Sequence, residues 1–192
     1  MIPAVDNEMF WGVIATARAH SGPGKLFDQA LSDYLATCTE QDILAYQRRF
    51  DEVHAVLYRW DVWAAAYLIG GGCSDDGFID FRAGLIAQGL DWYEKAAASP
   101  DSLAGHPTVA VAANRSAISP LFDEMVNYAA PLAFERMTGN KDAFNEACAR
   151  YRDPRERRNE EPAGEDFDFD DAQQMRRRLP RLSAIFLPNG PA

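Results

Sequence analysis

The chain has 192 residues, of which 47% are hydrophobic and 25% are charged, as in an ordinary globular protein and unlike a disordered or fibrous one. A folded chain of this length buries about 70% of the surface that its unfolded state exposes, so it needs neither disulfides nor a structural metal. Its formal net charge of −10 argues against a general nucleic-acid binder, which needs a basic face to displace counterions.

Cysteine usage and the absence of targeting patterns indicate the compartment. Cys38, Cys73 and Cys148 are odd in number and far apart in the sequence, which is typical of reduced thiols rather than of a disulfide framework. The first residues contain no basic region followed by a long apolar core, so we expect no signal peptide. No window approaches the length of an uninterrupted apolar membrane span. We therefore expect a cytoplasmic protein with no membrane partner.

Apolar residues recur at intervals of three and four along the N-terminal half of the chain, and this spacing predicts amphipathic helices. The helices that we expect cover residues 7–17, 23–38, 39–68 and 75–98. The third of these is long: its apolar positions run from Ile43 to Tyr67, about seven turns, with one gap of seven between successive apolar positions. Pro100 ends the fourth helix, and residues 100–118 have the composition of a loop, with a brief strand at TVAVAA, residues 108–113, as the alternative for that stretch.

The C-terminal half is expected to contain shorter helices. Residues 119–139 are predicted to be helical with a kink at Pro131, and residues 141–151 form another helix. From Glu160 to Asp171 there are seven acids and no base, which favours a flexible loop.

Together these patterns predict an all-α fold. We expect a single compact helical domain of about six or seven helices over residues 1–152. An acidic flexible loop would cover residues 153–171, and a C-terminal helix and tail over residues 172–192 would pack on the same domain.

The stretch GGGCSDDG, residues 70–77, is the most unusual in the chain. A glycine is the usual stop of a helix, Ser74 is a good N-cap, and Asp75 and Asp76 would lie in a first turn, where their charges are favourable. Capping leaves two glycines unexplained, and these would let a ligand or another helix approach the backbone closely, or would form an anion nest. The stretch has no lysine and is therefore not a P-loop.

Aromatic and charged residues flank this turn. Trp60, Asp61 and Trp63 precede it and Arg82 follows it, so they would line an apolar pocket with a few polar groups, unless the tryptophans belong to the core. The candidate ligand-binding residues are Trp60, Asp61, Trp63, Gly71, Gly72, Cys73, Asp75, Asp76 and Arg82. In a sharper version of this hypothesis, Asp75, Asp76 and Asp80 would bind a hard cation.

No coherent catalytic set is evident in the sequence. His20, His54 and His106 lack zinc-ligand spacing, and there is neither a C-x-x-C motif nor a G-x-S-x-G elbow. We therefore assign no catalytic residue, no metal ligand and no cofactor.

The stretch WDVWAAAYLIGGGCSDDGFIDFRAGLIAQG, residues 60–89, resembles the signature of an uncharacterised bacterial family, domain of unknown function 4240. MFWGVIATARA, RRFDEVHAVLYRWDVW, PDSL, FERMTG and RRRLPRLSAIF are similar to further landmarks of that family. The resemblance implies no catalytic residues, and implies a regulatory role only through relatives joined to a WGR-type module in proteins labelled as molybdate-metabolism regulators. The chain departs from the family pattern at Gly84, where many relatives have tryptophan, and over residues 106–120, which replace a more acidic segment.

Three hypotheses of function follow. We favour a non-enzymatic accessory, regulatory or protein-interaction protein of the bacterial cytoplasm that contacts another protein through its tail and its aromatic glycine turn. The first alternative is a small-molecule or cation-binding module, or an enzyme, with its site at the glycine turn between Trp60 and Arg82. The second is a nucleic-acid-linked regulator that uses Arg176, Arg177, Arg178 and Arg181, although the net charge disfavours nucleic acid as a partner.

Overall fold

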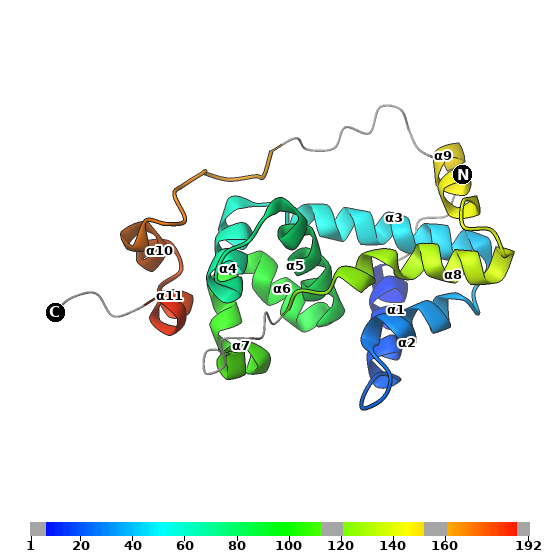
Figure 1. Cartoon of the computed structure of the whole chain (residues 1–192), viewed down its shortest axis with the longest axis horizontal. Coiled ribbons are helices and arrows are strands. Elements are labelled where there is room, and N and C mark those ends of the chain that lie inside the picture. Colours follow the sequence, from blue (N-terminus) through cyan, green and yellow to red (C-terminus); the bar gives the residue numbers. More distant parts are fainter. Residues whose placement is uncertain (1–6, 113–120, 152–160, 188–192) are drawn as a thin grey trace. The chain divides into compact units, whose positions relative to one another are not determined.

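The computed structural model describes residues 7–112, 121–151 and 161–187, and these residues form helices and two isolated β-bridges, with no strand among them (Figure 1). The predicted all-α class is confirmed. The chain divides into two compact units. One consists of Met1–Ala55 and Glu124–Glu160, and the other of Val56–Asp123 and Glu161–Ala192.

The first unit is built around helix α2, which contacts both α1 and α8. Its elements are α1 (Asn7–Ala19), α2 (Phe27–Leu35), α3 (Glu40–Val56, the last residue belonging to the other unit), the 3-10 helix η2 (Glu124–Tyr128), α8 (Ala129–Thr138) and α9 (Ala143–Tyr151). The core is aromatic, because Tyr46 stacks between Phe10 and Phe50 with ring centroids 5.2 and 6.2 Å away. These rings are all less than 5% exposed.

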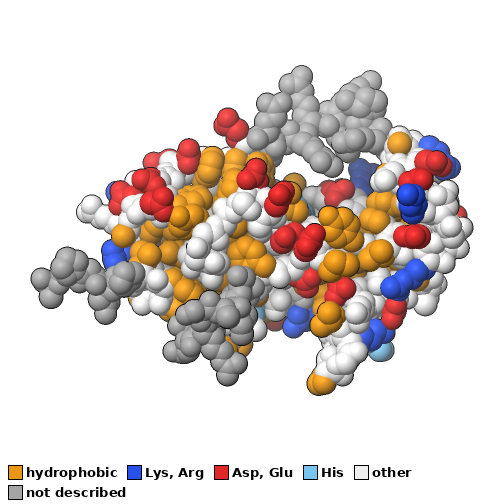
Figure 2. Space-filling model, in the orientation of Figure 1, with side chains coloured by type: hydrophobic (Ala, Val, Ile, Leu, Met, Phe, Trp, Pro, Cys, Tyr) orange, Lys and Arg blue, Asp and Glu red, His pale blue; other side chains and the backbone are white. Residues whose placement is uncertain are grey.

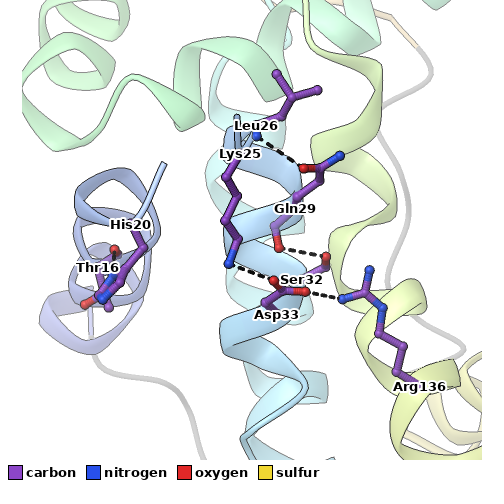
Figure 3. Close-up of polar contacts among 8 residues, drawn as sticks. All are labelled: Thr16, His20, Lys25, Leu26, Gln29, Ser32, Asp33 and Arg136. Atoms are coloured by element: carbon purple, nitrogen blue, oxygen red, sulfur yellow. Dashed lines mark hydrogen bonds and ion pairs between the residues drawn. The ribbon is translucent and has the colours of Figure 1, made fainter. Parts of the chain in front are cut away.

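A charged cluster on the surface of this unit joins distant segments. The Asp33 carboxylate of α2 pairs with Lys25 at 2.7 Å and with Arg136 of α8 at 2.5 Å (Figure 3). The hydrogen bond from Lys25, followed by that from Arg136, holds the pKa of Asp33 below its ordinary value.

The second unit contains the glycine turn. Its elements are α4 (Trp60–Gly70), α5 (Asp75–Ala87), α6 (Leu90–Ala98), the 3-10 helix η1 (Pro100–Gly105), α7 (Pro107–Ala112), α10 (Ala172–Arg178) and α11 (Pro180–Phe186). Helix α11 contacts η1 and α4, as expected of a docked C-terminal segment. Asp101 of η1 caps α11, accepting hydrogen bonds from the backbone N–H groups of Arg181 at 3.0 Å and Leu182 at 2.9 Å.

The prediction of one long helix through residues 39–68 is wrong, because α3 ends at Val56 and α4 begins at Trp60. At the break, the Trp60 N–H donates to the Ala163 carbonyl at 3.0 Å, and the Ala163 N–H donates to the Tyr58 carbonyl at 2.9 Å. A segment about a hundred residues away thus satisfies the backbone groups that the helix would have paired. The spacing of apolar residues within residues 39–68 gives no information about so distant a partner.

The predicted helix over residues 75–98 is also divided, into α5 and α6. Gly89, which lies within the predicted range, has φ of +88° and stands immediately before α6. That backbone conformation is outside the helical region and is readily adopted only by glycine. The expected six or seven helices are therefore too few for the described residues.

Two further expectations need correction. Residues 100–112, predicted to be a loop, form η1 and α7, while residues 113–118 lie outside the described ranges. The helix predicted over residues 119–139 with a kink at Pro131 is shorter than expected, because α8 starts only at Ala129. Pro131 therefore lies in the first turn of α8, where its missing N–H breaks no helical hydrogen bond.

Candidate functional site

The glycine turn between α4 and α5 ends one helix and starts the next. Gly71 has φ of +66° and Gly72 has φ of +123°; the Gly72 N–H donates to the Tyr67 carbonyl at 2.9 Å, which completes a Schellman-type stop. The hydroxyl of Ser74 accepts a hydrogen bond from the Gly77 N–H at 3.1 Å, which confirms the predicted N-cap.

The remaining glycine of the run, Gly70, allows a side chain to pack closely against the backbone. A Cβ atom built on Gly70 would lie 2.9 Å from the ring of Phe122, which in turn packs against Phe81 with ring centroids 5.1 Å apart. Gly70 therefore lets an aromatic ring lie directly on the end of α4. All three glycines of the run thus have a role in the fold.

Two of the three carboxylates at the turn are exposed to solvent. Asp75 and Asp76 are exposed in the first turn of α5, where their negative charges interact favourably with the helix dipole. Asp80 is half-buried, and its backbone carbonyl accepts a hydrogen bond from the Asp123 N–H at 3.1 Å. In the part of the chain that the structure describes, no three His, Cys, Asp or Glu side chains are grouped to hold a metal ion.

Three of the predicted site residues join one aromatic stack. Trp60 stacks on Trp63 at 5.6 Å, and Trp63 stacks on Phe78 at 4.8 Å. The Arg82 guanidinium lies 4.8 Å from the ring centroids of both Phe78 and Tyr58, and the residue is only 7% exposed. Burial lowers the pKa of Arg82 to about 10, so the side chain remains a cation at neutral pH and is held by cation–π contacts.

The two remaining polar candidates also make local contacts. The backbone carbonyl of Cys73 accepts a hydrogen bond from the Trp63 indole at 3.1 Å, and burial raises the pKa of the Cys73 thiol to about 11. A thiol that stays protonated at neutral pH is a poor nucleophile. Asp61 pairs with the guanidinium of Arg59, whose Nη1 also donates to the Ala97 carbonyl at 2.6 Å.

The structure adds residues that sequence reasoning missed. Phe169, from the acid-rich segment, packs against α4, with its ring centroid 6.2 Å from Trp60, 6.4 Å from Trp63 and 5.5 Å from Tyr67. The only signal in the sequence is the FDFDD pattern of residues 167–171, in which two phenylalanines interrupt the acids.

Further contacts hold the same segment in place. The Tyr67 hydroxyl donates to Asp170 at 2.5 Å, and this hydrogen bond raises the pKa of Tyr67. The Arg178 guanidinium lies 4.2 Å from the ring centroid of Phe167 and pairs with Glu165 at 3.0 Å. Residues 161–171 therefore have specific partners, while residues 152–160 lie outside the described ranges.

These contacts create a mixed surface on the second unit, which we call the aromatic–acidic face. It comprises the half-buried rings of Trp60, Trp63, Tyr67, Phe167 and Phe169 and the exposed carboxylates of Glu165, Asp166, Asp168 and Asp170. Figure 2 shows hydrophobic side chains gathered over α4 and α5, with acidic side chains beside them. Such a surface can combine apolar contact with attraction of positive charge.

Comparison with known families is consistent with this description. The family described as "Protein of unknown function (DUF4240)" matches residues 5–136, so the chain belongs to that family. No curated protein and no solved structure matches the chain. The matched region includes α4 and the glycine turn but ends before the acid-rich segment, and therefore before the closing RRRLPRLSAIF stretch. No described helix is both apolar enough and long enough to span a bilayer.

Proposed function

We propose that the chain is a non-enzymatic interaction protein that binds a basic segment of a partner protein through its aromatic–acidic face. The observation that carries this proposal is the packing of Phe169 on Trp60, Trp63 and Tyr67, which sets four half-buried rings beside exposed carboxylates. Aromatic side chains supply much of the contact energy at protein interfaces, and a border of one charge selects partners of the opposite charge.

The contacts of the candidate reactive groups support a binding rather than a catalytic role. Ser74 caps α5, Arg82 lies against two rings, and the Cys73 thiol, whose pKa is raised by burial, donates a hydrogen bond to the Ser74 carbonyl at 3.4 Å. Each of these groups has a structural partner that explains its position.

We further propose that the protein acts in the bacterial cytoplasm. All three cysteines are free thiols, which supports a reducing compartment, and the bacterial assignment rests on the family resemblance. The two alternative functions have less support. The three glycines of the turn are explained by helix termination and by Phe122, and Arg178 is already engaged by Glu165 and Phe167.

The proposal is tested by peptide binding. A fluorescently labelled peptide rich in arginine and leucine is titrated with the protein, and a matched peptide carries citrulline in place of each arginine. We expect saturable binding of the arginine peptide that weakens with added salt, because exposed charges are screened. The triple variant Glu165→Gln, Asp166→Asn, Asp168→Asn should bind about tenfold more weakly, since each exposed charge contributes a fraction of a kcal/mol.

The matched control removes the same charge elsewhere. Glu94→Gln, Glu135→Gln and Glu146→Gln together replace three exposed acids that lie outside the aromatic–acidic face. This control should bind the arginine peptide as the wild type does. Equal weakening in both triple variants, or equal binding of the citrulline peptide, would show a non-specific effect of net charge and would overturn the proposal.

A further inference from the structure

The aromatic–acidic face contains a hollow of about 170 Å³ beside the glycine turn. Its lining combines aromatic, aliphatic and acidic side chains, those of Tyr67, Leu68, Phe169, Asp170, Phe186 and Leu187. Gly71 of the turn lines it as well. Three rings and one carboxylate therefore face a single space, a combination that suits a cation better than a neutral or an anionic group.

Asp170, which supplies this carboxylate, is held both at its backbone and at its side chain. The Asp170 N–H donates to the Asp168 carboxylate at 2.9 Å, and Oδ1 of Asp170 accepts the Tyr67 hydroxyl at 2.5 Å. An ionised carboxylate has several lone-pair sites, so this arrangement leaves acceptor capacity on Asp170. Asp168 adds negative charge nearby and contributes to the raised pKa of Tyr67.

The same segment shows how a cation uses such a combination. Arg178 lies over the ring of Phe167 at 4.2 Å while its Nη2 pairs with Glu165 at 3.0 Å. Here one aromatic face and one carboxylate together hold a guanidinium. The hollow contains the same two components. Phe169 lies two residues after Phe167, and Asp170 lies five residues after Glu165.

The size of the hollow fits a guanidinium. A cavity of about 150 Å³ holds benzene, which has six heavy atoms, and a guanidinium with two methylenes has the same number. A guanidinium is also planar and more weakly hydrated than an ammonium, so it stacks on rings at a lower desolvation cost. These properties favour arginine over lysine as the occupant.

We infer that this hollow receives an arginine side chain from the basic segment of the partner protein, with the guanidinium against Phe169 and Phe186 and paired with Asp170. The inference rests on the proposed function and specifies its central contact.

The experiment uses the arginine side chain alone. The full chain, labelled with ¹⁵N, is titrated with Nα-acetyl-arginine amide, and with Nα-acetyl-citrulline amide, which has the same shape without the charge. We expect saturable shifts at the backbone amides of Gly71, Asp170 and Leu187 with the arginine compound. Citrulline should bind about tenfold more weakly, because it loses both the ion pair and the cation–π attraction.

Two variants separate the hollow from its surroundings. Asp170→Asn should weaken arginine-amide binding about fivefold, while the amide oxygen can still accept the Tyr67 hydroxyl. Asp166→Asn removes an exposed charge from the same segment outside the hollow and should change the affinity less than twofold. If Asp170→Asn perturbs the fold, Phe186→Leu offers a second test, since it removes one ring face and keeps an apolar side chain.

Each outcome separates this inference from the proposed function. Equal binding of the arginine and citrulline compounds, shifts elsewhere on the protein, or an unaltered Asp170→Asn variant would overturn the inference. If the arginine peptide still binds through the aromatic–acidic face in that case, the proposed function stands. If arginine amide binds in the hollow but the peptide binds no more tightly than the amide, the hollow is a site for a small cation and the proposed function fails.

Discussion

The glycine turn and the aromatic–acidic face lie on the same helix, α4, but they are organised by contacts of different range. In the turn, Gly72 bonds to Tyr67 and Gly77 bonds to Ser74, so each partner is at most five residues away. On the face, Tyr67 bonds to Asp170, which is 103 residues away. The segment that resembles a ligand loop thus ends α4 and starts α5, while an acid run that resembles a linker supplies the surface.

Replacing a glycine that permits long-range packing should lower the free energy of unfolding more than replacing a glycine that permits a local turn. Gly84 provides the strongest test of this expectation. A Cβ atom at Gly84 would lie 1.9 Å from the carbonyl oxygen and 2.6 Å from the carbonyl carbon of Leu121. Because backbone atoms cannot yield as a side chain can, we expect Gly84→Ala to lower the free energy of unfolding by about 3 kcal/mol in urea denaturation.

Gly12 in α1 provides the control for that substitution. A Cβ atom at Gly12 meets nothing within 4 Å, so Gly12→Ala should leave stability unchanged or raise it by up to about 1 kcal/mol. A Gly84→Ala protein as stable as the wild type would mean that the backbone at Leu121 does not cross α5 as closely as the structure has it.

The second prediction concerns the anchor of the acid-rich segment. Phe169→Ala should lower the free energy of unfolding by about 2 kcal/mol. This is less than the loss expected for a fully buried ring, because Phe169 is half-buried. Hydrogen exchange should accelerate at the Ala163 amide, which bonds to Tyr58, but not at the Gly77 amide, whose partner Ser74 is local. Phe169→Leu should restore most of the protection at Ala163, and equal acceleration at both amides would contradict the distinction between local and remote contacts.

The third prediction tests the turn itself. Gly71 has φ of +66°, so Gly71→Ala should cost about 1 kcal/mol without any ligand present, as measured by thermal or urea unfolding. Gly71→Asn should cost less, because asparagine adopts the left-handed region more readily. A Gly71→Ala variant of unchanged stability would indicate that the glycine is not needed to end α4.

The smallest effect is expected from removing a charged partner of Asp33, a residue of the first unit with one local partner, Lys25, and one remote partner, Arg136. Lys25 and Arg136 lower its pKa, so its ion pairs are fully formed above the ordinary carboxyl pKa and are lost as the pH falls through the lowered value. In ¹³C NMR titrations, Lys25→Gln should raise the Asp33 midpoint more than Arg136→Gln, because the Lys25 hydrogen bond makes the larger contribution. The reverse order would show that the remote pair dominates.

The sequence by itself determined the all-α class, most of the regions that are helical, and the capping of the glycine turn. Apolar spacing and caps such as Ser74 depend on neighbours within about one or two turns, and those neighbours are visible in the sequence. The family could be recognised for the same reason, since its signature is one continuous stretch from Trp60 to Gly89.

Only the tertiary structure decided where the long helices break and what covers α4. The break before Trp60 depends on Ala163, the close crossing at Gly84 depends on Leu121, and the aromatic–acidic face depends on Phe169. These partners are tens of residues away or more, and a phenylalanine within an acid run has no periodic neighbours to reveal its burial. Contacts of this kind are selected by the free energy of the whole fold rather than by local preference, and so one sequence window cannot predict them.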